Sequence, residues 1–228
     1  TLLYDLEAGN FTDELLELFG VPRRDALAEV KDSAGGFGKT AGLSFLPDGI
    51  PITGILGDQQ AALAGQTCFA EGEAKCTYGT GAFLLLNTGT KMRLSTYGML
   101  TTVAWSLGGE RQFALEGSAF IAGAAVQFMR DQLGTVEQAG DSEALAKAAK
   151  GAPEVYFVPA LAGLGAPHWD PEARGAFFGL TRGTSAGQLV RAALEGIAFQ
   201  VSELLAAMRV DSAAELKVLR VDGGAAAN

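Results

Sequence analysis

Glycine placement is the sequence feature that most limits how this chain can fold. The chain has 31 glycines in 228 residues, nearly twice the usual share of about 7%. They are clustered rather than periodic, which excludes collagen-like and repeat structures. The groups Gly79-Thr80-Gly81, Gly108-Gly109 and Gly223-Gly224 each stand at the end of an apolar run. Because glycine readily adopts positive φ, these groups predict short strands that are joined or ended by tight turns.

The segments between the glycine groups alternate in character from residue 74 onward. Two strand pairs are expected first, then a helix capped by Ser118, a strand, a long helix and a last strand; the segments are 74–89, 101–117, 118–134, 155–161, 185–209 and 216–222. The long helix carries apolar residues at spacings of three and four, which is typical of a helix packed on a sheet. This order predicts an α/β domain with a mixed sheet flanked by helices.

The segment before residue 74 contains a candidate catalytic acid. A short helix is expected over 12–19, a loop over about 32–51, and a buried strand in "PITGILGD", which ends at Asp58. Ligands gather beyond the carboxyl ends of strands in α/β sheets, so Asp58 could accept a proton from an alcohol that attacks phosphorus. Gln59 could hydrogen-bond a polyol. A structural alternative is that Asp58 caps the helix that follows.

The stretch "SAGGFGKTAG", residues 33–42, resembles the end of a P-loop but does not fit one. The motif needs a glycine where this chain has Ser33. Its Lys-Thr should also open a helix, whereas Gly42, Pro47 and Gly49 follow closely and prevent one. A glycine-rich surface loop is therefore expected here, and any phosphate would be bound elsewhere.

Three features could contact a nucleotide, although each is also compatible with a purely structural role. The turn at Gly79-Thr80-Gly81 could bring backbone amides and a hydroxyl to phosphate oxygens. Gly123 and Gln127 share a helix face, and Gly224 follows a strand. A plain turn, helix packing and a strand exit are the respective alternatives.

The charge and the cysteine content limit the classes of binding partner and the cellular setting that we expect. The net charge is −9 and there is no Lys/Arg cluster, which argues against nucleic acid and anionic membranes. No apolar run is long enough to span a bilayer, so no membrane insertion is expected. Two cysteines, Cys68 and Cys76, are too few for a disulfide scaffold and favour a reducing, cytoplasmic setting. The chain starts at Thr1 and ends just after a Gly-Gly turn, so a piece of a longer protein is expected.

Five segments together resemble the FGGY carbohydrate kinases, and within them the members that phosphorylate glycerol. They are "GILGDQQAALAGQ", "AKCTYGTGAFLLLNTG", "ALEGSAFIAG", "VPALAGLGAPHWDPEARGAFFGLTRGT" and "LRVDGGAAAN". Residues 175–195 also fit the second signature of the family. The resemblance runs along nearly the whole chain.

The resemblance implies two actin-like (ribonuclease H-like) ATPase domains that transfer the γ-phosphate of ATP to the 3-hydroxyl of glycerol with Mg²⁺. Residues 1–65 would be the end of the first domain with the interdomain connection, and residues 66–228 most of the second, nucleotide-binding domain. Asp58 would be the catalytic base and a glycerol contact. The other implied contacts are Gln59 and Phe83 for glycerol, and Thr80, Gly123, Gln127, Gly224 and Asn228 for the nucleotide.

Parts of the family pattern have no counterpart here. The first phosphate loop and the Arg, Glu and Tyr that complete the glycerol site are missing, so the chain alone is expected to transfer no phosphate. Gly49 stands where some members have an arginine that binds an inhibitory sugar bisphosphate. A homo-oligomer is expected for the full-length form. Two alternatives stay open: a kinase of another polyol or sugar, of the xylulose or gluconate type, and a non-catalytic actin-like nucleotide-binding module.

Overall fold

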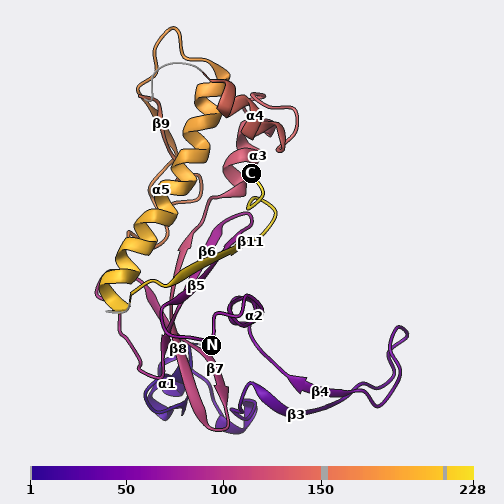
Figure 1. Cartoon of the computed structure of the whole chain (residues 1–228). Coiled ribbons are helices and arrows are strands. Elements are labelled where there is room, and N and C mark those ends of the chain that lie inside the picture. The colour runs from indigo at the N-terminus through magenta and orange to yellow at the C-terminus, as the bar shows by residue number, and fades with distance from the viewer. Residues whose placement is uncertain (1, 150–153, 213–214) are drawn as a thin grey trace.

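A five-stranded mixed sheet forms the centre of the computed structural model, which describes residues 2–149, 154–212 and 215–228. The strand order is β11-β5-β6-β8-β7 (Figure 1). The strands are β5 Glu73–Tyr78, β6 Ala82–Gly89, β7 Leu100–Leu107, β8 Glu110–Ala119 and β11 Val218–Asp222. β11 runs parallel to β5 and every other neighbouring pair is antiparallel. The expected mixed sheet is confirmed.

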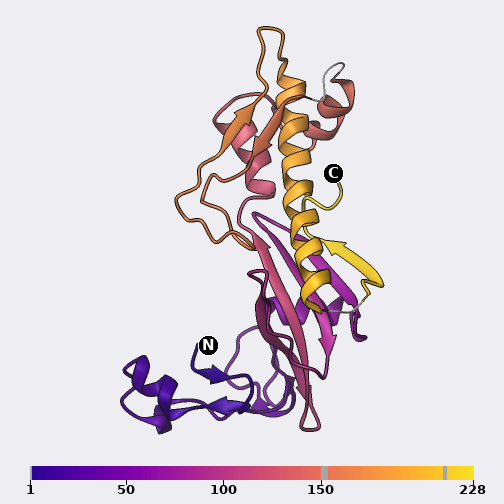
Figure 2. The ribbon, with the colours of Figure 1, turned by 90° about the vertical axis from the view of Figure 1, so that its left-hand side faces the viewer.

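Helices cover both faces of this sheet. The long helix α5, Ala186–Ser212, lies along one face, and the short helix α2, Asp58–Gly65, covers the other (Figures 1 and 2). Helix α3, Gly123–Asp131, packs against α5 beyond the end of the sheet (Figure 1). Successive strand residues point to opposite faces, so Leu84 packs on the α5 side and Leu85 on the α2 side. The apolar content of β6 on both faces follows from this double coverage.

The α5 side also carries two smaller units. Helix α4, Asp141–Ala148, packs against α5. Strands β9, Tyr156–Val158, and β10, Ala176–Phe178, form an antiparallel pair beside the same helix. The apolar stripe expected along α5 is buried, with Val190, Ile197, Val201, Leu204 and Met208 all in the core. The helix extends three residues past the expected end at residue 209, to Ser212.

The segment from 34 to 54 differs from the sequence-based expectation. Strands β3, Ala34–Lys39, and β4, Pro51–Gly54, form an antiparallel hairpin that projects from the rest of the molecule (Figure 1). A strand does form within the expected range, but it is exposed and ends at Gly54, so its expected burial and its expected end at Asp58 were wrong. The loop expected over about 32–51 was wrong where β3 forms. β4 is exposed throughout because its partner is glycine-rich and offers few side chains to cover it. Lys39 ends a strand rather than opening a helix, which confirms that no P-loop is present.

The residues before this hairpin rest on the turn between β7 and β8. They form the short elements β1 Tyr4–Asp5, β2 Asn10–Phe11, α1 Asp13–Leu18 and η1 Arg24–Ala26. Arg111 of β8 donates a hydrogen bond to the Leu6 carbonyl at 2.6 Å. The carboxylate of Asp32 accepts one from the Gly109 amide at 2.9 Å. Polar contacts thus attach this segment to an edge of the sheet.

Two local expectations need correction. The helix expected from Ser118 begins at Gly123, because residues up to Ala119 continue as strand β8 along β6. The turn at residues 79–81 does not use positive φ at its glycines. Gly81 is needed for a different reason: a Cβ there would lie 2.6 Å from the Ala119 carbonyl oxygen.

None of the helices in the described part of the chain combines the length and the apolar character needed to cross a membrane.

Substitution of Gly81 by alanine tests the close approach of Gly81 to the Ala119 carbonyl oxygen. We expect Gly81→Ala in the full-length protein to lower the free energy of unfolding by about 2 kcal/mol, since the added methyl overpacks two backbone segments. Gly79→Ala is the matched control, because a Cβ there would be 3.8 Å from its nearest neighbour. Urea denaturation measures both variants. Equal destabilisation of the two would contradict the assignment.

Candidate functional site

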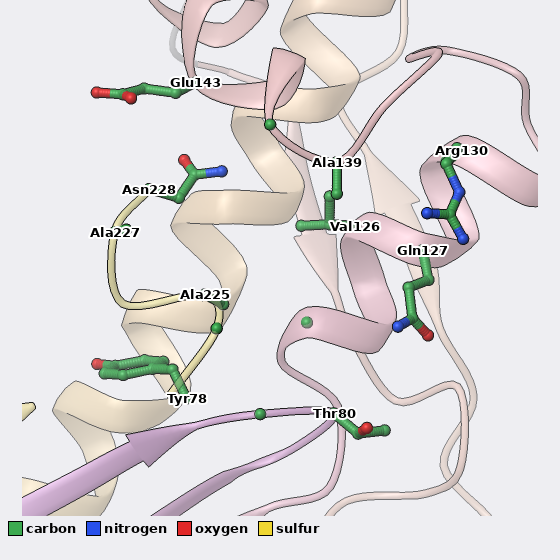
Figure 3. A pocket seen from close by; sticks show the side chains of 14 residues that line it. Tyr78, Thr80, Val126, Gln127, Arg130, Ala139, Glu143, Ala225, Ala227 and Asn228 are labelled. Atoms are coloured by element: carbon green, nitrogen blue, oxygen red, sulfur yellow. The ribbon is translucent and has the colours of Figure 1, made fainter. Parts of the chain in front are cut away.

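A pocket of about 350 Å³ lies at the edge of the sheet where β5 and β11 end (Figure 3). Because the two strands are parallel, their carboxyl ends meet at the same edge. Four segments line the pocket: the turn after β5, helix α3, the start of α4 and the chain after β11. The lining residues are Tyr78, Gly79, Thr80, Gly123, Val126, Gln127, Arg130, Ala139, Gly140, Glu143, Gly224, Ala225, Ala227 and Asn228.

The structure brings all five residues with an expected nucleotide role to this one pocket: Thr80, Gly123, Gln127, Gly224 and Asn228. The side chains of Thr80 and Gln127 are exposed, and Figure 3 shows Thr80 at the strand end, Gln127 on α3 and Asn228 on the tail after β11. Individually weak signals from distant parts of the sequence therefore converge in space. That they bind a nucleotide stays a prediction.

Hydrogen bonds join the turn after β5 to the start of α3. The Ala122 and Ala124 amides donate to the Thr80 carbonyl at 2.8 and 3.1 Å, and the Gly123 amide donates to the Gly79 carbonyl at 2.9 Å. A Cβ on Gly123 would lie 2.6 Å from that Gly79 oxygen. Gly123 is therefore required by packing. Because these helix amides are already used, other groups would have to bind a phosphate.

The two glycines after β11 serve different purposes. Gly223 has a φ of 93° and approaches β5 so closely that a Cβ would lie 2.3 Å from the Tyr78 carbonyl oxygen. Gly224 has ordinary φ and no atom within 4 Å of a Cβ position. The first glycine makes the turn, and the second keeps the pocket wall free of a side chain.

Sequence reasoning missed three polar side chains that line the pocket: Tyr78, Arg130 and Glu143. Burial raises the pKa of Tyr78 to about 12, so the hydroxyl is uncharged at neutral pH. Arg130 follows Gln127 by three residues, and this helical spacing could have revealed it. At the other side, the Asn228 amide donates to the Ser142 hydroxyl at 2.6 Å, which holds the tail against α4.

The expected glycerol contacts lie outside this pocket, on the sheet face that α2 covers. Asp58 is the first residue of α2 and is exposed. Gly57 rather than Asp58 occupies the cap position, so the capping alternative was wrong. One carboxylate oxygen of Asp58 accepts a hydrogen bond from the Gln59 amide at 2.8 Å. Gln59 and Phe83 are half-buried.

A buried lysine connects these residues, and the sequence analysis did not single it out. Lys75 on β5 is fully buried, and its ammonium donates to the Gln59 side-chain oxygen, to the Thr77 hydroxyl at 3.1 Å and to the Phe83 carbonyl at 3.2 Å. Burial lowers the pKa of Lys75, and the charges of Asp222, Cys76, Glu116 and Asp58 oppose that shift. A lysine between Ala74 and Cys76 in an apolar strand was the available signal.

The two groups of residues are close along β5. Thr77, which contacts Lys75, precedes Thr80 of the pocket by three residues, about 10 Å along an extended chain. A pocket with a glycine turn at the carboxyl ends of parallel strands suits a phosphate-bearing ligand. The exposed Asp58 carboxylate, at the start of α2, suits proton transfer.

No cluster of three or more His, Cys, Asp or Glu side chains that could hold a metal occurs in the described ranges. Both cysteines are buried, and burial raises the pKa of the Cys76 thiol to about 11. His168 lies in a different region, where its ring contacts the Glu203 carboxylate at 3.1 Å. These residues do not contribute to the pocket.

Glu116 provides a test of the electrostatics under α2. Burial raises the pKa of this carboxyl above its ordinary value of 4.5, Lys75 partly offsets that shift, and Asp58 adds to it. Because the folded-state pKa of Glu116 is raised, the folded protein favours the protonated carboxyl. The resulting stabilisation is complete at pH values below the unfolded-state pKa and is lost as the pH rises through the folded-state pKa. We expect Glu116→Gln to raise the free energy of unfolding at pH 7 and to have no effect near pH 3, as measured by denaturation at both values. A loss of stability at pH 7 would be the opposite result.

Comparison with known proteins identifies the family of this chain. Residues 74–228 match the model of the C-terminal domain of the FGGY family of carbohydrate kinases. The chain is 56% identical over 230 residues to a glycerol kinase of Myxococcus xanthus, covering 100% of this chain and 46% of that protein. It thus spans about half the length of the curated relatives it matches.

Solved structures give the same result. The chain matches the glycerol kinase of Plasmodium falciparum, crystallised with ADP, with a TM-score of 0.89 at 37% identity, over 100% of this chain and 46% of that one. A ligand-bound xylulose kinase of Lactobacillus acidophilus matches with a TM-score of 0.80 at 19% identity, over 97% and 45% of the two chains; this likeness concerns the fold alone. The fold is the actin-like ATPase fold of these kinases, and the chain belongs to the FGGY family of carbohydrate kinases.

Proposed function

We propose that this chain is part of an enzyme that phosphorylates glycerol to glycerol 3-phosphate with ATP. The observation that carries the proposal is the convergence of Thr80, Gly123, Gln127, Gly224 and Asn228 on one pocket. Helix α2, which begins with the exposed Asp58, contacts β5, the strand that leads into the pocket, and this supports the proposal further. The choice of glycerol rests on 56% identity to a protein named glycerol kinase, because the match to the xylulose kinase is limited to the fold.

The proposed reaction needs two actions from this chain. The turn at Thr80 and the α3 side chain Gln127 bind and orient the triphosphate. The Asp58 carboxylate accepts the proton of a glycerol hydroxyl while that oxygen forms a bond to the γ-phosphorus and the bond to ADP breaks. Phe83 and Gln59 contact the glycerol backbone and hydroxyls. The pocket residues therefore position the triphosphate, Gln59 and Phe83 position the glycerol, and Asp58 accepts the proton.

Mg²⁺ fits this site as a partner of the nucleotide. In such sites it is held by one or two carboxylates together with substrate phosphates and water, which agrees with the lack of a three-ligand cluster among the described residues. Glu143 is the carboxylate that lines the pocket. Asp58 is the carboxylate at the acceptor site, the group of residues expected to contact glycerol. When bound, the ion would neutralise charge on the transferred phosphate.

We further propose that residues 1–65 belong to the first domain of the enzyme and to the interdomain connection. Large apolar side chains in this segment are exposed, including Phe19, Phe45 and Ile52, and such surfaces mark contacts with other protein surfaces. Because phosphoryl transfer depends on positioning from both sides of the substrate, this chain alone would not turn over glycerol.

The general-base role predicts the effect of Asp58→Asn in the full-length protein that contains this chain. The amide has the shape of the carboxylate but cannot accept the proton, so kcat should fall by about 10²- to 10⁴-fold. Affinity for ADP and the free energy of unfolding should stay unchanged. A coupled assay of glycerol-dependent ADP release measures kcat, with Asp48→Asn, an exposed hairpin carboxylate, as the control. If Asp58→Asn keeps kcat within tenfold of the original, the assignment is wrong.

The nucleotide role predicts the effect of Gln127→Ala. The side chain is exposed in the pocket, so its loss should raise the Kd for ADP by about three- to tenfold while changing stability by less than about 0.5 kcal/mol. Gln132→Ala is the matched control, because Gln132 is exposed at the end of the same helix and does not line the pocket. Titration calorimetry measures both. Equal affinities of the two variants would count against this pocket as the nucleotide site.

A further inference from the structure

The one fully buried lysine side chain among the described residues is Lys75, and none of the roles proposed above uses it. It lies on β5 and points to the face that α2 covers, opposite to Cys76 in the main core. A buried ammonium loses its hydration, so its presence in a sheet core requires compensating partners. The hydrogen-bond acceptors around Lys75 therefore indicate its role.

The ammonium of Lys75 has three N–H donors, and the structure provides an acceptor for each of them. They are the Gln59 side-chain oxygen, the Thr77 hydroxyl oxygen at 3.1 Å and the Phe83 main-chain oxygen at 3.2 Å. Three occupied donors fix the direction of the ammonium. They also tie α2 to the paired strands β5 and β6, in addition to apolar contacts such as those of Leu63 and Leu85.

Two of these three acceptors belong to residues expected to contact the alcohol, Gln59 and Phe83. The third expected alcohol contact, Asp58, interacts with the charge of Lys75. A single buried cation therefore contacts or attracts each residue that this chain contributes to the acceptor site. Its neighbour in the sheet, Arg220, is paired with Glu73 at 3.6 Å instead.

The contact with Gln59 has a chemical consequence. Because the ammonium can only donate, it holds the carbonyl oxygen of the Gln59 amide. The NH₂ end of the same amide is then turned away from Lys75, where it can donate to a hydroxyl oxygen. The orientation of Gln59, and with it the polarity that a polyol would meet, depends on the lysine.

We propose that Lys75 is a positioning residue that orients Gln59 and the Phe83 backbone for binding of the alcohol substrate. The proposal rests on the function proposed above and deepens it, since it concerns the acceptor half of the site and leaves the nucleotide pocket untouched. Lys75 is not expected to contact either substrate, because its three donors are occupied within the protein.

The test uses Lys75→Met in the full-length protein, since methionine has a similar length but neither charge nor donors. We expect the KM for glycerol to rise about three- to tenfold, because a misoriented Gln59 amide loses its hydrogen bond to a substrate hydroxyl. The Kd for ADP should change by less than about twofold, because the nucleotide pocket keeps its residues. Arg220→Met is the matched control: it removes a cation from the neighbouring position of the same sheet face and should leave both constants unchanged.

A double-mutant cycle separates positioning from a general structural role. If Lys75 acts through Gln59, the effect of Lys75→Met on the glycerol KM should be much smaller in a Gln59→Ala background. Thermal unfolding of all variants shows whether a change in KM merely follows a change in stability. If Lys75→Met does not fold, Lys75→Arg is measured instead, and a raised glycerol KM with unchanged ADP affinity is expected because a planar guanidinium cannot reproduce the three contacts.

The outcomes distinguish failure of the role proposed for Lys75 from failure of the proposed function of the enzyme. A full-length protein that is active on glycerol, with an unchanged glycerol KM in the Lys75 variant or with fully additive effects in the cycle, overturns only the role of Lys75. Parallel losses of glycerol and ADP binding together with lowered thermal stability overturn it as well, in favour of a structural role. A full-length protein that releases no ADP with glycerol contradicts the proposed function and this inference together.

Discussion

Strand β5 is the element on which the rest of the site depends. It is hydrogen-bonded to β11 on one side and to β6 on the other, so its position is set by the whole sheet. Its carboxyl end leads into the turn at Thr80, whose carbonyl oxygen accepts hydrogen bonds from the start of α3. Its α2-facing side carries Lys75, which holds the Gln59 side chain, and Thr77, whose hydroxyl accepts a hydrogen bond from Lys75. One strand therefore positions both the pocket expected to bind the nucleotide and the residues expected to bind the alcohol.

Close approach of main-chain segments around β5 explains why several positions must be glycine, which the composition of the chain does not reveal. Gly81, Gly123 and Gly223 each have a main-chain oxygen within 2.6 Å of the position that a Cβ would take. Only Gly223 of the three also needs positive φ. Gly224 has free space around it, and its lack of a side chain leaves room in the pocket. Close packing of the main chain at the ends of β5 and β8 thus fixes the shape of this site.

Sequence patterns predicted the central sheet and the long helix, because these depend on periodic apolar residues and on local turns. They also indicated part of the pocket, whereas Asn228 was expected only from the family resemblance. They failed at "PITGIL", where an apolar run suggested burial but the strand pairs only with the glycine-rich β3 and stays exposed. They failed again at Ser118, because pairing with β6 extends β8 beyond the expected helix start. A lysine within the apolar strand β5 was a visible signal, but its contact with Gln59 arises from α2 packing on the sheet, which no local pattern contains.

The central claim is that the Asp58 carboxylate and the pocket at Thr80 act on the same phosphoryl group. The most direct measurement is a crystal structure of the full-length protein with glycerol and a non-hydrolysable ATP analogue. The account predicts a glycerol hydroxyl within about 2.6–3.2 Å of the Asp58 carboxylate, with the terminal phosphate between that hydroxyl and the Thr80 turn. An analogue bound away from Thr80 and Gln127, or glycerol bound away from Asp58, would contradict it.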